Sequence, residues 1–145
     1  ETPQSPPSHL IRLMRYTLAL SWTVIVLVML LQSSAQPVVG PAAPPGDPDL
    51  RRELMLTAGH IIGFGGLTLL WWWAFRYTLP NRRAVLIAIS IALVLGVLTE
   101  YLQTAVADRN TSLFDLAVNI GVTLLTGYAL LRRIHIAVLS RIMDS

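Results

Sequence analysis

Four long apolar stretches, separated by short polar segments, account for most of this sequence of 145 residues. Each stretch is about 20 residues long, the length that an α-helix needs to cross the hydrocarbon core of a bilayer. A chain that is 54% hydrophobic, with a mean hydropathy of +0.60, is typical of an integral membrane protein. We therefore expect one all-α transmembrane domain over residues 1–145, a bundle with helices at about 13–31, 54–75, 84–107 and 113–131.

The segments between these stretches contain residues that interrupt helices. Residues 32–53 hold five prolines, a density that excludes a continuous helix. Residues 76–83 and 108–112 are short polar turns. The tail at 132–145 has Arg141 among Ile, Val, Leu and Met, so it is either an extension of the fourth helix or an interfacial amphipathic helix.

The distribution of arginine predicts how the chain crosses the membrane. All eleven basic residues are arginine, and four spans would put eight of them on one side and three, Arg51, Arg52 and Arg109, on the other. Basic residues favour the cytoplasmic side, so we expect both termini in the cytoplasm and the Pro-rich loop outside. Because the arginines flank apolar stretches as topology signals do, we expect no nucleic-acid partner, although the isoelectric point is about 10.

Polar side chains gather at one depth in the expected bundle. Charge inside an apolar span costs about 2.5 to 3.5 kcal/mol per residue, so it is rare without a reason. Near the outer helix ends lie His60, Glu100, Gln103, Asp115 and Asn119, with Arg109 and Ser112 in the turn above them. Glu100 and Gln103 are three residues apart, so they share one helix face. Asp115 and Asn119 are four residues apart, so they also share a face. Since lipid cannot satisfy polar groups, we expect these faces to turn toward one another and form a polar layer.

The same residues carry a resemblance to the VanZ-like family of membrane proteins. The matching pattern is His60 and Phe64, then Glu100 and Gln103, then Arg109, Ser112, Asp115 and Asn119. The match lies within about residues 55–128. It departs from the family at one position: family members commonly have a glycine three residues after the asparagine. In this sequence that position is Val122, and Gly121 comes one residue earlier. The resemblance implies a small multi-pass protein of the bacterial cytoplasmic (inner) membrane, linked in some members to glycopeptide (teicoplanin) resistance, with no established reaction. Other members occur as fused or auxiliary modules.

Several roles are open for the polar layer. We expect Glu100, Arg109 and Asp115 to form one coupled cluster, with Arg109 as the counter-charge and His60 or Asn119 nearby. Such a cluster is either a structural ion-pair network or a ligand-binding site. A Glu–His pair can do acid–base chemistry, but no nucleophile is evident, and one histidine with two carboxylates is weak evidence for a metal. We expect no catalytic residue, metal or cofactor, with axial ligation of haem or chlorophyll by His60 as a minor alternative.

Two further features belong to the second helix. Trp71, Trp72 and Trp73 end it on the cytoplasmic side. Such a triplet is typical of the aromatic belt at a membrane interface, and the alternative is a surface that packs on a pigment, quinone or partner helix. Gly59 and Gly63 have the spacing that lets a second helix approach closely.

Two functions of different kinds fit these features. One is a non-catalytic accessory subunit that stabilises a larger membrane assembly, such as a respiratory or photosynthetic electron-transfer complex, with lipids and other membrane-protein subunits as partners. The other is a stand-alone VanZ-like protein whose outer pocket binds an envelope ligand, such as a cell-wall precursor or a glycopeptide. An intramembrane hydrolase comes third. The accessory-subunit hypothesis predicts that residues 1–12 or 36–50 pack on another chain or a lipid, because Pro-rich segments need outside support to be ordered.

Overall fold

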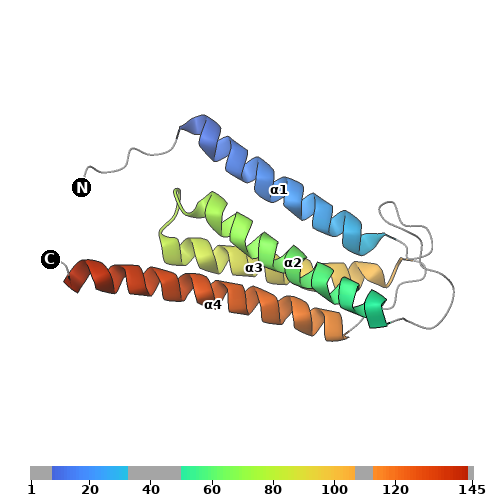
Figure 1. The fold of residues 1–145 in the computed structure, drawn as a ribbon. Helices are drawn as coiled ribbons and strands as arrows, with labels where there is room; N and C mark the ends of the chain where they lie inside the picture. Colours follow the sequence, from blue (N-terminus) through green and yellow to red (C-terminus); the bar gives the residue numbers. More distant parts are fainter. Residues whose placement is uncertain (1–7, 33–49, 107–112, 144–145) are drawn as a thin grey trace.

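The computed structural model of the chain describes residues 8–32, 50–106 and 113–143, and every regular element in these ranges is an α-helix. In chain order the helices are α1 (His9–Leu31), α2 (Leu50–Phe75), α3 (Asn81–Gln103) and α4 (Leu113–Met143). They lie alongside one another as one elongated bundle (Figure 1). The expected all-α architecture with four long helices is confirmed.

Each of the four helices contains a span that is long and apolar enough to cross a membrane. Only 17% to 33% of the residues in each apolar window are buried inside the bundle, so most apolar side chains face outward. An exterior of this kind matches lipid and not water, because soluble proteins rarely expose large contiguous apolar surfaces. The described helices therefore define a multi-pass membrane protein.

Consecutive helices run in opposite directions, so their ends gather in two places (Figure 1). The start of α1, the α2–α3 turn and the end of α4 lie at one end, which we call the basic end because it holds Arg12, Arg15 and Arg76. The end of α1, the start of α2, the end of α3 and the start of α4 lie at the other, which we call the polar end. The polar end carries the candidate site.

Local sequence explains where α1 begins. The helix starts at His9 rather than near residue 13, because Ser8 caps it: the Ser8 side-chain oxygen accepts a hydrogen bond of 3.4 Å from the backbone N–H of Ile11. This places Arg12 inside the first turns of α1, on the same helix face as Arg15, three residues later.

The limits of the later helices also differ from the expected ones. α3 begins at Asn81, directly after Pro80, and ends at Gln103, short of the expected limit near residue 107. Residues 104–106 form turns with hydrogen bonds back to the last turn of the helix. α4 runs unbroken to Met143, so of the two alternatives for the tail the structure shows the extension of the fourth helix.

A row of small residues makes α3 the helix against which α2 and α4 pack. Ala84, Ala88, Ala92 and Gly96 recur every four residues on one face, and the three alanines are completely buried. Small side chains let neighbouring backbones approach closely, which is how helices associate in a membrane without a hydrophobic driving force.

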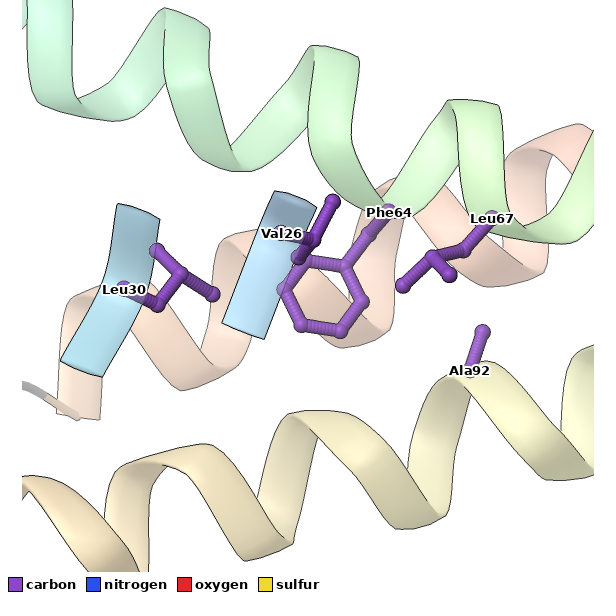
Figure 2. Close-up of a cluster of buried hydrophobic side chains, with 5 residues drawn as sticks. All are labelled: Val26, Leu30, Phe64, Leu67 and Ala92. Atoms are coloured by element: carbon purple, nitrogen blue, oxygen red, sulfur yellow. The ribbon is translucent and has the colours of Figure 1, made fainter. Parts of the chain in front are cut away.

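The centre of the bundle is an apolar cluster of side chains from three helices: Val26, Leu30, Phe64, Leu67 and Ala92. Figure 2 shows Val26 and Leu30 from α1, Phe64 and Leu67 from α2, and Ala92 from α3 around the shared interior. Phe64 and Leu67 are at most 1% exposed. This cluster lies next to the polar end, so it fixes the helices that carry the polar side chains.

Indole hydrogen bonds attach α1 to α2. The Trp22 N–H donates to the carbonyl oxygen of Gly63 at 3.1 Å, and the Trp71 N–H donates to the Thr23 hydroxyl at 3.1 Å. A tryptophan inside an apolar span needs such an acceptor for its N–H. These bonds fix α1 at one height along α2.

The close contact between α1 and α2 does not use the pair of glycines, Gly59 and Gly63, that the spacing in the sequence indicated. A Cβ at Gly63 would lie 3.4 Å from Val26, and one at Gly66 would lie 2.6 Å from the Trp22 ring, whereas one at Gly59 would meet nothing within 4 Å. The close approach therefore uses Gly63 and Gly66, and the expected role of Gly59 is wrong. Trp22 selects this face because its ring lies against Gly66.

Candidate functional site at the polar end

Three polar side chains from α2 and α4 meet at the polar end. His60 Nδ1 lies 2.9 Å from Asn119 Oδ1, within hydrogen-bond distance, and His60 Nε2 lies 3.8 Å from Asp115 Oδ2. Asp115 and Asn119 are four residues apart on α4, so both reach the same imidazole. His60 and Asn119 are 2% and 1% exposed, while the Asp115 side chain is 25% exposed and reaches the surface of the bundle.

The hydrogen bond to Asn119 assigns different roles to the two ring nitrogens of His60. When Asn119 Oδ1 accepts, His60 Nδ1 is the donor, so a neutral ring presents the lone pair of Nε2 toward Asp115. A proton on Nε2 would turn that contact into an ion pair. The geometry thus joins a fully buried amide to a partly exposed carboxylate through one imidazole.

Apolar groups hold the imidazole in place. The Phe64 ring, one helical turn along α2, is nearly parallel to the His60 ring, with an interplanar angle of 7° and centroids 6.4 Å apart. Gly96 on α3 makes room for both partners, because a Cβ there would lie 3.4 Å from Phe64 and 3.5 Å from Asn119. α3 therefore closes the site from a third side.

The polar residues of α3 occupy the same end of the bundle. Glu100 is 8% exposed and Gln103 is 2% exposed. The Gln103 side-chain amide donates to the backbone carbonyl of Leu30 at 3.0 Å. This carbonyl belongs to the last turn of α1, where helix carbonyls lack intrahelical partners, so Gln103 ties α3 to α1.

Two predicted members of the polar layer, Arg109 and Ser112, lie outside the described residues. The prediction that Arg109 supplies the counter-charge for Glu100 and Asp115 stays a prediction. The packing predicted for residues 1–12 and 36–50 falls largely on residues 1–7 and 33–49, which also lie outside the described part of the chain.

Two buried polar atoms on α4 have hydrogen-bonding capacity to spare. Asn119 Nδ2 and Thr123 Oγ1 are inaccessible to solvent and have no hydrogen-bond partner among the described residues. Thr123 lies one turn beyond Asn119 on the same face of α4. Buried donors are normally satisfied, so these two atoms leave room for a bond to a water molecule or a bound polar group.

A groove of about 300 Å³ opens between α1 and α2 beside the polar layer. Its walls are apolar side chains of the two helices, including Ile25, Met29, Met55 and Leu56, and among the described residues that line it His60 is the ionisable one. The sequence did not predict this groove, because it depends on the lateral position of α1. Trp22, which fixes that position, also lines the groove; its indole in the middle of an apolar span was the available signal.

The surroundings of His60 indicate whether this residue could bind a metal or a pigment. Within the described ranges, no three His, Asp or Glu side chains come together as a metal site would require. Axial ligation of haem or chlorophyll needs an accessible ring nitrogen, but Nδ1 faces Asn119, Nε2 faces Asp115, and the residue is 2% exposed. The geometry therefore disfavours the axial-ligand alternative.

The three tryptophans at the basic end differ in their surroundings. Trp71 points into the bundle, where it bonds to Thr23 and stacks on Phe75 with centroids 5.4 Å apart. Trp72 and Trp73 lie beneath arginine side chains. Trp71 thus belongs to the core of the bundle, and Trp72 and Trp73 belong to its interface with the membrane surface.

The fold and the polar end define a class of protein: a small multi-pass helical membrane protein with a buried polar group at one end of its bundle. Comparison of the chain with models of known protein families, with curated proteins and with solved structures finds no match.

Proposed function

We propose that this protein is a non-catalytic, VanZ-like protein of the bacterial cytoplasmic membrane that binds an amphipathic envelope ligand at its polar end. The polar layer would receive the head of the ligand, and the groove between α1 and α2 would hold its apolar chain. One observation carries the proposal: His60 belongs both to the polar group with Asp115 and Asn119 and to the wall of the apolar groove.

The shape and lining of the groove support a binding role. Ligand sites are concave, mostly apolar and equipped with a few placed polar groups, and their volumes begin at about 300 Å³. The groove matches this description, with a volume of about 300 Å³ and His60 in an otherwise apolar wall. The unsatisfied atoms Asn119 Nδ2 and Thr123 Oγ1 support a site that takes up a further polar group.

The contacts of His60 support binding over catalysis. A general base activates a nucleophile through a direct hydrogen bond, whereas the His60 ring nitrogens face the amide of Asn119 and the carboxylate of Asp115. On α3, the hydroxyl of Thr99 donates to the Gly96 carbonyl within its own helix. In the described part of the chain, no hydroxyl is hydrogen-bonded to His60 as a hydrolase would require.

A pair of glycine variants tests the proposal. Gly59 lines the groove, and a Cβ there would meet nothing within 4 Å, so Gly59→Leu places its side chain in the space of the groove. Gly121 on α4 is equally open but outside the groove, so Gly121→Leu is the matched control. Binding of a polyprenyl-linked cell-wall precursor to the purified chain in nanodiscs should weaken about tenfold in Gly59→Leu, as expected when about 1.4 kcal/mol of contact is lost, and stay unchanged in Gly121→Leu. Equal binding by the two variants, or none by the wild type, would contradict the proposal.

An accessory subunit of a larger assembly is the second candidate, and one feature favours it. A shallow groove of about 370 Å³ between α2 and α4 is lined by Leu69, Leu125 and Ala129, and the two leucines are 45% and 68% exposed. Such a groove suits a helix of another subunit. Extraction of the native membrane in mild detergent decides between the candidates: a stoichiometric co-purifying subunit favours the assembly, and a chain that runs alone favours the stand-alone protein.

A further inference from the structure

The basic end carries a second structured site, which is separate from the polar end. It is an arginine–aromatic cluster made of Arg15, Arg76, Trp72, Trp73 and Tyr77. The Arg15 guanidinium carbon lies 4.5 Å from the centroid of Trp73 and 4.1 Å from that of Tyr77. The Arg76 guanidinium carbon lies 5.0 Å from Trp72 and 4.9 Å from Tyr77. Two cations, Arg15 from α1 and Arg76 from the turn after α2, therefore meet at one tyrosine ring.

The cluster gathers positive charge, and no carboxylate in the described part of the chain lies beside it. Arg12 lies on the same face of α1 as Arg15, and its side chain is half-buried like that of Arg15. Among the side chains that the structure describes, the carboxylates are those of Glu100 and Asp115, and both lie at the polar end. Like charges held this close repel, so the cluster favours an anion from outside the described bundle.

The guanidinium groups also have unused hydrogen-bond donors. Arg12 Nε, Arg15 Nε and Arg15 Nη1 are buried, as is the indole nitrogen of Trp72, and none of them has a hydrogen-bond partner among the described residues. The aromatic rings satisfy the charge of a guanidinium through its face, but they do not accept the N–H groups at its edge. A phosphate accepts two parallel N–H bonds from such an edge, with a geometry that arginine is built to recognise.

The position of the cluster identifies the source of the phosphate. The apolar spans of α1, α2 and α3 begin or end at His9, Phe75 and Asn81, so the cluster lies at the level where the hydrocarbon core ends. Tryptophan and tyrosine rings favour this level, where lipid headgroups lie. A phosphate at this depth belongs to a phospholipid.

We infer that the arginine–aromatic cluster binds the headgroup phosphate of an anionic phospholipid. Both guanidinium carbons lie over the Tyr77 ring, and the Nε and Nη1 atoms of Arg15 have no hydrogen-bond partner among the described residues. Zwitterionic lipids offer the same phosphate but add a compensating positive charge, so a cluster with no counter-charge among the described side chains selects lipids with a net negative headgroup. This inference uses no residue of the polar end and does not depend on the proposed ligand there.

Native mass spectrometry of the full chain tests the inference with phosphatidylglycerol and phosphatidylcholine as probes. The wild type should retain phosphatidylglycerol in preference. Arg15→Gln should weaken this retention about fivefold, while Arg83→Gln, which removes one charge from an exposed residue at the same end, should change it less than about twofold. If the two variants lost phosphatidylglycerol retention equally, the retention would depend only on the net charge of this end, and the inference would be overturned. Equal retention of the two lipids by the wild type would also overturn it.

Two further measurements use the wild-type chain, so they do not depend on whether the Arg15→Gln variant folds. Phosphatidylglycerol with brominated acyl chains should quench the tryptophan emission of the wild-type chain more than brominated phosphatidylcholine does, because Trp72 and Trp73 line the site. Equal quenching by the two lipids would overturn the inference. Inorganic phosphate, added in large excess, should leave the retained phosphatidylglycerol in place. Its displacement by phosphate would assign the site to a soluble anion and reject the lipid.

Discussion

At the scale of single residues, the His60–Asn119 hydrogen bond is the interaction on which the polar end most depends. Both side chains are almost completely buried, and their bond joins α2 to α4 at 2.9 Å. A buried polar group that loses its partner costs about 1 to 3 kcal/mol, whereas removal of both partners costs less than the sum of the two single losses. The stability of this end therefore depends on the pair and not on either residue alone.

A double-mutant cycle measures this coupling. Asn119→Ala and His60→Ala should each lower the free energy of unfolding in detergent, and the double variant should be less destabilised than the sum by about 0.5 to 3 kcal/mol. Chemical unfolding followed by circular dichroism gives the three values. Arg83→Gln, at an exposed position at the other end of the bundle, serves as a control that should leave stability almost unchanged. Additive effects of the two substitutions would show that the pair is not coupled.

At the scale of the helix, the contact between α1 and α2 depends on the absence of a side chain at Gly66. A Cβ at this position would lie 2.6 Å from the Trp22 ring, which is too close for any real contact. Trp22 is held by its bond to the Gly63 carbonyl, so it cannot move away without losing that bond. Any residue larger than glycine at Gly66 would therefore displace α1 from α2.

Alanine substitutions at two glycines separate this packing effect from helix propensity. Gly66→Ala should destabilise the bundle by about 1 to 3 kcal/mol, the usual cost of overpacking, and should move the Trp22 emission to longer wavelength as the indole leaves its site. Gly121→Ala faces open space and should be neutral or stabilising by up to about 1 kcal/mol, because alanine has the higher helix propensity. Similar behaviour of the two variants would show that Trp22 adapts without cost.

The same contact shows which parts of the structure a single sequence can predict. The four helices follow from the length of the apolar stretches, since a span of about 20 residues leaves few alternatives. The approach of Asp115 and Asn119 to His60 could be predicted from their spacing on one helix face, together with the common depth that four antiparallel spans impose. These inferences need only periodicity and topology.

The position of α1 around the bundle could not be predicted in this way. An apolar helix in lipid has no single face marked by polarity, so its rotation depends on side-chain shape. Here Trp22 selects Gly63 and Gly66 instead of the Gly59–Gly63 pair. The bond from Gln103 to the Leu30 carbonyl and the groove beside His60 both follow from that choice.

At the scale of the whole molecule, the two ends of the bundle are chemically different. The described carboxylates lie at the polar end, and the arginine–aromatic cluster lies at the basic end. Because the helices span a membrane, each end meets a different aqueous compartment. The proposed ligand and the inferred lipid would then bind on opposite faces of the membrane, so the orientation of the chain decides which compartment each site faces.

Cysteine labelling tests the expected orientation, in which the basic end faces the cytoplasm. The chain contains no cysteine, so each introduced thiol gives an unambiguous signal. Asn81 is an exposed residue at the basic end, and Gly40 belongs to the segment between α1 and α2. A membrane-impermeant maleimide applied to intact cells should label Gly40→Cys and not Asn81→Cys, because eight arginines on one side against three on the other favour that side as cytoplasmic. Labelling of both variants after the membrane is opened is the control. The reverse pattern in intact cells would place the polar end in the cytoplasm, where an envelope ligand from outside could not reach it.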